Sequence, residues 1–149
     1  MIPLVSRQAS LEDYPQFERI YADLGERADV PSAAEFAASI APHAILLEEV
    51  SAGAVVGYAH FVADGGVGRV IHVAVDREWR GAGVGRALMA EIASRLRTQG
   101  CTRWELEVSP ENAAAIRFFE ATGLRTVPTA DASDRVRMEG ELPSPVIPE

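Results

Sequence analysis

A glycine-rich loop between a strand-like run and a helix-like run is the feature that most constrains this chain. The stretch over residues 66–96 reads GVGRVIHVAVDREWRGAGVGRALMAEIASRL. Its first part is an apolar run rich in β-branched residues, which is typical of a largely buried strand. Its last part has apolar residues at helical spacing, namely Leu88, Met89, Ile92 and Leu96. We therefore expect a strand, a glycine turn and a helix in this order.

The loop itself contains three glycines, Gly81, Gly83 and Gly85, between two arginines, Arg80 and Arg86. Without Cβ atoms, such a loop can turn tightly and bring backbone N–H groups against a ligand. A helix start adds unpaired N–H donors and a partial positive charge. Strand, loop and helix start together predict an anion site, most naturally for a phosphate or a diphosphate. The flanking guanidinium groups can add charge-assisted hydrogen bonds.

The spacing of the glycines excludes two common phosphate-binding motifs. A Walker loop has a Lys-Ser/Thr pair after its last glycine, where this chain has Arg86 and Ala87. A dinucleotide fingerprint runs G-x-G-x-x-G, whereas this loop runs G-x-G-x-G. An ordinary strand-to-helix turn is the plain alternative, but three glycines and two arginines exceed what a bare turn requires.

Composition bounds the rest of the interpretation. The 149 residues, 48% of them hydrophobic, predict one globular domain over residues 1–142 and a Pro-rich tail without fixed structure over residues 143–149. No apolar run approaches the roughly 20 residues of a membrane span, and the first residues match neither a signal nor a transit peptide. The only cysteine, Cys101, allows no internal disulfide, so a cytoplasmic location is the default expectation.

The formal net charge of −8 bears on the class of partner. It argues against nucleic acid, because binding there usually needs a basic face. It is compatible with a cationic amine substrate, although an acidic surface also simply favours solubility.

Periodicity predicts the order β-α-α-β-β-β-α-β-α-β-β. Helices are expected after Ser10, after Ser32, after the glycine loop and after Asn112. Strands are expected at residues 2–5, 44–50, 54–62, 67–75, 103–108, 125–129 and 135–142. Short glycine turns imply antiparallel hairpins, and the strand-helix-strand crossover implies one parallel pair. The fold class is therefore α/β of the α+β kind, with a mixed, mostly antiparallel sheet and helices on both faces.

Two blocks of the sequence resemble one known family. Arg80-x-x-Gly83-x-Gly85 matches the Arg/Gln-x-x-Gly-x-Gly/Ala signature of the GCN5-related N-acetyltransferases (GNAT family). The second block lies within residues 106–124 and comprises Leu106-Glu107-Val108, Asn112, Ala115-Ile116 and Gly123-Leu124. The resemblance implies the single-domain acyl-CoA N-acyltransferase fold, acetyl-CoA as the cosubstrate and no metal. It also implies an amine acceptor, either a small molecule or a peptide, and a homodimer is common among similar proteins.

The resemblance also assigns binding residues for the cosubstrate. Its diphosphate is expected on the backbone of Arg80, Gly81, Ala82, Gly83, Val84, Gly85 and Arg86. The pantetheine arm is expected to pair with Val73, Ala74 and Val75 like an added strand, in a V between two splayed strands. Asn112 and Phe119 complete the expected set, although Asn112 can equally be a helix cap.

Catalytic residues follow from a similarity to enzymes that acetylate the N-terminal amine of ribosomal proteins. In those enzymes the Glu of Leu-Glu-Val is the general base, and a Tyr seven residues after the Asn is the acid. Here the Glu is Glu107, but Phe119 stands where the Tyr is expected and cannot donate a proton. A carboxylate base works best when it is partly buried or beside a like charge, and Glu105 lies on the same strand face. The plain alternative is that Glu107 lies on a solvated face, and water, Tyr58 or bulk solvent could replace the acid.

Other candidates receive structural interpretations. His72 on the central strand is expected to be a packed core residue, and His43 and His60 do not suggest a metal site. Acceptor specificity is expected in residues 25–34, for which the sequence offers no code. Two alternatives to an acetyltransferase stay open: a non-catalytic acyl-CoA binding module, and a nucleotide-binding protein that the glycines fit poorly.

Overall fold

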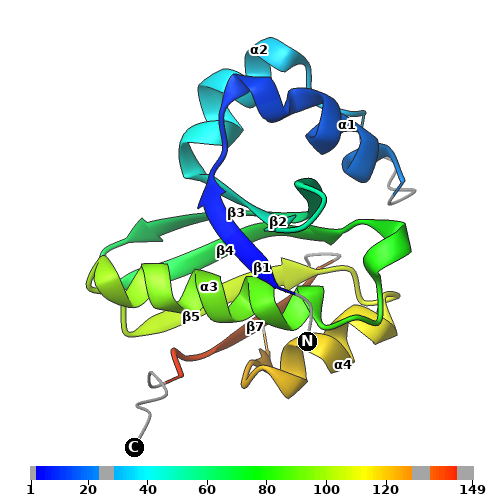
Figure 1. Cartoon of the computed structure of the whole chain (residues 1–149). Helices are drawn as coiled ribbons and strands as arrows, with labels where there is room; N and C mark the ends of the chain where they lie inside the picture. The colour runs from blue at the N-terminus through cyan, green and yellow to red at the C-terminus, as the bar shows by residue number, and fades with distance from the viewer. Residues whose placement is uncertain (1–2, 24–28, 129–134, 144–149) are drawn as a thin grey trace, which may run out of the picture. The chain divides into compact units, whose positions relative to one another are not determined.

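The computed structural model describes residues 3–23, 29–128 and 135–143 (Figure 1). The strands are β1 (Leu4–Gln8), β2 (Ala44–Glu49), β3 (Ala54–Asp64), β4 (Val67–Val75), β5 (Arg103–Val108), β6 (Arg125–Val127) and β7 (Val136–Glu141). The α-helices are α1 (Tyr14–Ala22), α2 (Ala33–Glu35), α3 (Val84–Thr98) and α4 (Ala113–Ala121). Short 3₁₀ or π turns are η1 (Leu11–Asp13), η2 (Phe36–Ile40), η3 (Ala41–His43) and η4 (Arg77–Trp79). The expected element order is confirmed.

The seven strands form one sheet in the order β1-β2-β3-β4-β5-β7-β6. The pairs β1–β2, β2–β3, β5–β7 and β6–β7 are antiparallel, and β4–β5 is parallel as the crossover predicts. The mixed, mostly antiparallel sheet is therefore confirmed. The closing hairpin is not placed in chain order, because β7 lies beside β5 and β6 lies at the edge. No described helix is both long enough and apolar enough to cross a membrane.

Contacts group the chain into two compact units. The first comprises residues 1–61 and 72–91, and the second comprises residues 62–71 and 92–149. The single domain over residues 1–142 stays a prediction. The sequence also predicts a helix end at Gly25 and a polar loop at Asp131–Asp134. Both positions, and the expected tail beyond Pro143, lie outside the described residues.

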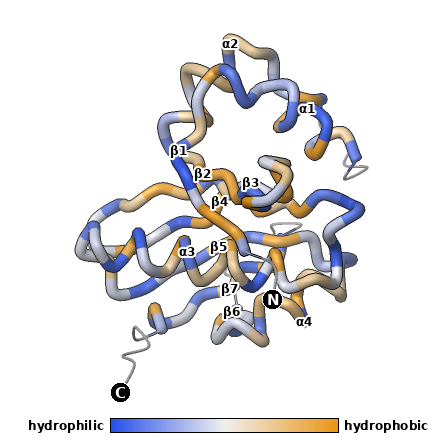
Figure 2. Tube along the Cα trace, viewed as in Figure 1, coloured by the Kyte–Doolittle hydropathy of each residue, from blue (hydrophilic) through white to orange (hydrophobic). Residues whose placement is uncertain are grey.

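An aromatic cluster forms the core of the first unit. Phe17 of α1 packs against Phe36 at 4.6 Å and Tyr58 of β3 at 4.8 Å between ring centroids, and all three are buried. Figure 1 shows α1 and α2 above β2 and the adjoining part of β3. In Figure 2 α1 alternates between hydrophobic and hydrophilic colours, as expected for a helix that buries one face.

The two predicted helix starts that precede β2 carry capping contacts. The backbone N–H of Ser10 donates to the Asp13 carboxylate at 2.8 Å, so Asp13 takes the role that Glu or Gln usually has in a capping box. Asp13 also accepts two hydrogen bonds from the Arg7 guanidinium, at 2.6 and 2.8 Å, which lower the pKa of this carboxyl. Ser32 accepts from the backbone N–H of Glu35 at 3.1 Å, which satisfies one donor at the second start.

The core of the second unit lies on one face of β5. Residues 103–108 read RWELEV, and this alternation of charged and apolar residues predicts one charged and one buried face. Trp104, Leu106 and Val108 are buried and the alternate positions carry the charged residues, so the prediction is confirmed. Two glycines allow close packing here. A Cβ on Gly68 would overlap the Leu96 side chain, and one on Gly140 would lie 2.6 Å from a backbone carbonyl oxygen.

Candidate functional site

The glycine loop in the first unit has the geometry of a backbone anion site. Gly81 and Gly83 have φ angles of +82° and +87°, and a Cβ at either position would meet nothing within 4 Å. Both residues are exposed, so the inner surface of the loop is open to a ligand. Positive φ disfavours any L side chain, so these two positions require glycine for the turn itself.

Helix α3 follows the loop directly. At its start the backbone N–H of Ala87 donates to the Gly83 carbonyl oxygen at 3.0 Å. The backbone N–H groups of Val84, Gly85 and Arg86 come before Ala87 in the chain. N–H donors in the first turn of a helix have no carbonyl acceptor within that helix. Gly85, which the sequence groups with the loop, is already helical. The arrangement suits a diphosphate, which can accept several backbone hydrogen bonds at a positive helix end.

Arg80 is held at the edge of the loop. Its Nε donates to the carbonyl oxygen of Val75 at 3.3 Å, and its guanidinium lies 3.7 Å from Asp23 at the end of α1. The side chain is still 47% exposed, so it can contact an anion without unfolding the loop. The Val75 carbonyl, expected to pair with pantetheine, therefore accepts a hydrogen bond from this arginine. Arg86 is exposed on the first turn of α3.

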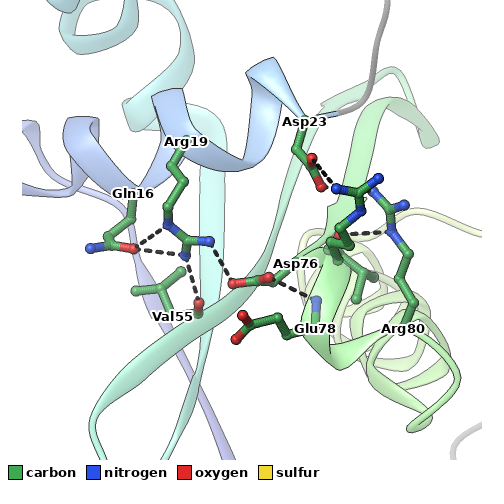
Figure 3. Close-up of polar contacts among 9 residues, drawn as sticks. Gln16, Arg19, Asp23, Val55, Asp76, Glu78 and Arg80 are labelled. Carbon is green, nitrogen blue, oxygen red and sulfur yellow. Dashed lines mark hydrogen bonds and ion pairs between the residues drawn. The ribbon is translucent and has the colours of Figure 1, made fainter.

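A buried carboxylate that the sequence analysis missed fixes the start of the loop (Figure 3). Asp76, 7% exposed, accepts from Arg19 of α1 at 2.6 Å and from the backbone N–H of Glu78 at 3.0 Å. Its own N–H donates to the Val56 carbonyl of β3 at 2.8 Å. The residue thus caps η4 and ties the loop to two elements. The sequence signal was an Asp that ends an apolar strand, which is a common capping position.

Asn112 and Phe119 lie in the second unit. Asn112 caps α4, because its Oδ1 accepts from the backbone N–H of Ala115 at 3.1 Å, so the capping alternative is confirmed. Phe119 is half-buried and packs edge-on against Phe118 with centroids 5.3 Å apart. Whether either residue contacts a cosubstrate stays a prediction.

A charged cavity of about 330 Å³ lies in the second unit where β4 and β5 part. The parallel ladder ends at Arg69 opposite Glu105, although β4 continues, and β5 remains paired with β7 to its last residue. The cavity is lined by Arg69, Val70, Ile71, Glu105, Leu106, Glu107, Arg135 and Arg137. The strand separation is the local feature that the family resemblance predicts as a V.

The two glutamates of this cavity differ in environment. Glu105 has a side chain 17% exposed and pairs with Arg137 at 2.5 Å and with Arg69 at 3.3 Å. Glu107 is 63% exposed and lies 3.8 Å from Arg135. The partial burial expected for Glu107 is therefore absent, and the charge of Glu105 is offset by two arginines. The base role of Glu107 stays a prediction, carried by its position in the cavity rather than by burial.

The histidines lie in the first unit. His72 is half-buried, its Nδ1 lies 2.8 Å from the Tyr58 hydroxyl, and its ring packs edge-on against Tyr21 at 5.3 Å. His60 stacks on His43 with centroids 6.5 Å apart. Burial is the main cause that lowers the pKa of His60 to about 4, and His43 and His72 add to it. No group of three or more His, Cys, Asp or Glu that could hold a metal occurs in the part of the chain that the structure describes.

Comparison with known proteins decides the family. The profile of the acetyltransferase (GNAT) family matches residues 8–124. The chain belongs to the GNAT family. A mycothiol acetyltransferase of Thermobispora bispora is 44% identical over 61 residues, which are 41% of this chain and 21% of the relative. An acetyltransferase of Yersinia enterocolitica is 30% identical over 100 residues, which are 67% of this chain and 70% of the relative.

The fold of this GNAT protein is also found among solved structures. N-acetylglutamate synthase from Neisseria gonorrhoeae, solved with coenzyme A and N-acetyl-glutamate, superposes with a TM-score of 0.78 at 18% identity. The match covers 97% of this chain and 36% of the synthase. At this identity the likeness confirms the acyl-CoA N-acyltransferase fold. The chain spans only about a fifth of the mycothiol acetyltransferase, 21% of its length.

Sequence reasoning found the loop but missed most of the cavity. The charged face of β5 was recognised, yet the cavity's arginines come from β4 and from residues 135 and 137. The alternation Arg135-x-Arg137 was a signal for a charged strand face. This alternation could not reveal that β7 pairs with β5, because the pairing of distant strands is not encoded in the local sequence.

Proposed function

We propose that this protein is an acetyl-CoA-dependent N-acetyltransferase, in which acetyl-CoA and an amine meet in one ternary complex. The observation that carries the proposal is the loop from Arg80 to Arg86, with two glycines at positive φ leading into the open first turn of α3. Family membership and the CoA-bound synthase of the same fold support it.

In this proposal the backbone amides of residues 80–86 hold the diphosphate of coenzyme A. Arg80 and Arg86 add charge from the loop edge and from the first turn of α3. Val73, Ala74 and Val75 offer backbone groups to the pantetheine arm, in the manner of strand addition. Asn112 and Phe119 are two further proposed contacts with the cosubstrate.

The reaction is direct acetyl transfer. The amine nitrogen forms a bond to the thioester carbonyl carbon, the carbon–sulfur bond breaks, and the thiolate leaves with its electron pair. Glu107 is proposed to take the proton that the amine loses, and the Val73 N–H to stabilise charge on the carbonyl oxygen. Phe119 supplies no proton, so the leaving thiolate is protonated by water.

The test combines coenzyme A binding by calorimetry with thiol release from acetyl-CoA across an amine panel. Gly83→Asp places a like charge and a strained side chain in the loop, and we expect a loss of about 100-fold or more in affinity. Gly53→Asp is the matched control, because Gly53 also has positive φ, +66°, with open space around it, but lies in the β2–β3 turn. Equal affinity in both variants would refute the loop assignment.

Binding without turnover would favour the alternative function, a non-catalytic acyl-CoA binding module. The observation behind this alternative is Phe119 in place of a proton donor. Rapid thiol release with any amine would exclude it.

A further inference from the structure

The lining of the cavity in the second unit has a net positive charge, whereas the whole chain has a net negative charge. The chain has 22 acidic and 14 basic residues, with a formal net charge of −8. The cavity is lined by three arginines and two glutamates, with the remaining lining residues apolar. A site evolved only to attract a cationic amine would carry an excess of carboxylates.

The excess positive charge has a definite place. Glu105 pairs with both Arg69 and Arg137. Glu139 lies 3.7 Å from Arg137 and also pairs with Arg103, so this connected set of three arginines and two glutamates has a net charge of +1. Arg69 and Arg137 remain accessible, with side chains 64% and 46% exposed. Arginine presents its N–H groups in a fixed fork that matches a carboxylate with two parallel hydrogen bonds.

Glu107 and Arg135, the other two charged residues of the cavity, form a weaker pair. Glu107 is 63% exposed and lies 3.8 Å from Arg135, so its carboxylate faces solvent with a loose partner. An ammonium or amine group is the natural partner of such a carboxylate. The cavity volume of about 330 Å³ lies at the small end of the roughly 300–1,000 Å³ typical of small-molecule sites.

We propose that the acceptor of this enzyme carries a carboxylate beside its amine, as a free amino acid does, and that Arg69 and Arg137 bind this carboxylate while Glu107 faces the amine. The proposal rests on the proposed acetyltransferase function and names its substrate class. It excludes polyamines and simple alkylamines as preferred acceptors, because these would bring a second positive charge to the arginines.

The experiment compares acceptors that differ only in the carboxylate. L-leucine is measured against L-leucinamide, and L-glutamate against its α-amide, with spermidine as a cationic amine. The wild-type protein is expected to prefer each acid over its amide by about 10-fold to 100-fold in kcat/KM, the factor that one or two charge-assisted hydrogen bonds supply. The intrinsic chemistry favours the amides, whose amines deprotonate more easily, so a preference for the acids requires recognition by the protein.

The variants Arg69→Gln and Arg137→Gln should raise KM for the acids and reduce the acid-to-amide ratio in kcat/KM toward one. Arg103→Gln is the matched control, because Arg103 pairs with Glu139 at 2.9 Å on the same charged strands but does not line the cavity. An unchanged ratio in both cavity variants overturns the proposal, as does a wild-type preference for amides or spermidine.

A binding measurement separates this proposal from the proposed function. With coenzyme A present, L-glutamate should raise the Tm of the wild-type protein and of Arg103→Gln, but not that of Arg137→Gln. If acids bind in this way while no acceptor is acetylated, the carboxylate site stands and the acetyltransferase function fails. If amides are acetylated while acids neither bind nor react, the function stands and the carboxylate site fails.

Discussion

The glycine loop and the charged cavity are two candidate sites built by different means. The loop presents backbone N–H groups, and the residues that form it are close together in sequence, from Asp76 to Arg86. The cavity presents side chains that three separate strands bring together, from Arg69 to Arg137. A site built from backbone groups can therefore be predicted from its glycines, whereas a site built from side chains of several strands can be recognised only once the strand pairing is known.

The two sites also differ in how a substitution should act. A backbone site tolerates most changes of side chain but fails when a glycine at positive φ gains a Cβ. A side-chain site loses function through single exposed residues with little effect on stability. The following substitutions test this difference between the two sites.

The largest effect is expected at Glu107. Glu107→Gln removes the proposed base without changing the shape of the side chain, so kcat should fall by about 10²-fold to 10⁴-fold. Because the side chain is 63% exposed, the free energy of unfolding should change by less than about 0.5 kcal/mol. Steady-state kinetics and urea unfolding measure both. Glu139→Gln is the control from the same charged face of the sheet. If Glu107→Gln keeps the wild-type kcat, Glu107 is not the base and is only a solvent-exposed residue of β5.

A smaller effect is expected at Asp76, where the loop depends on a side chain after all. Asp76→Ala removes the acceptor for Arg19 and for the Glu78 N–H, so η4 loses its cap. We expect a loss of about 2 kcal/mol in the free energy of unfolding and about 10-fold in coenzyme A affinity. Asp64→Ala, at an exposed strand end, should change neither. Unaltered coenzyme A affinity in Asp76→Ala would show that the glycines alone shape the loop.

The smallest effect is expected at Asp13, which belongs to neither site. Its pKa lies below the usual value of 3.8, chiefly because the Arg7 guanidinium donates to it. A carboxyl with a lowered folded-state pKa stabilises the fold above its unfolded pKa and loses that contribution as pH falls through the folded value.

Asp13→Asn should therefore cost about 1 kcal/mol at pH 7, because the half-exposed Arg7 weakens the pair by solvent screening. The difference from the wild type should shrink as the pH is lowered toward 2. Urea unfolding at several pH values measures this, with Glu12→Gln as an exposed neighbouring control. A difference that does not depend on pH would assign the effect to packing rather than to charge.

Much of the fold was predictable because its signals are local. Alternation along residues 103–108 marked the buried and charged faces of β5, and Ser10 and Ser32 marked two helix starts that the structure confirms. The parallel pairing of β5 with β4 followed from the handed crossover through α3. The position of β7 between β5 and β6 did not follow, because no local feature of residues 136–141 specifies which strand they pair with.

The sequence by itself determined the glycine loop, since a residue without Cβ is the chemical requirement for positive φ at Gly81 and Gly83. The sequence also indicated the family, through the spacing Arg80-x-x-Gly83-x-Gly85. Only the tertiary structure decided that Asp76 is buried against Arg19, and that Arg69 and Arg137 share one glutamate. Burial and charge pairing depend on residues distant in the chain, so their energies exist only once the strands and helices have packed.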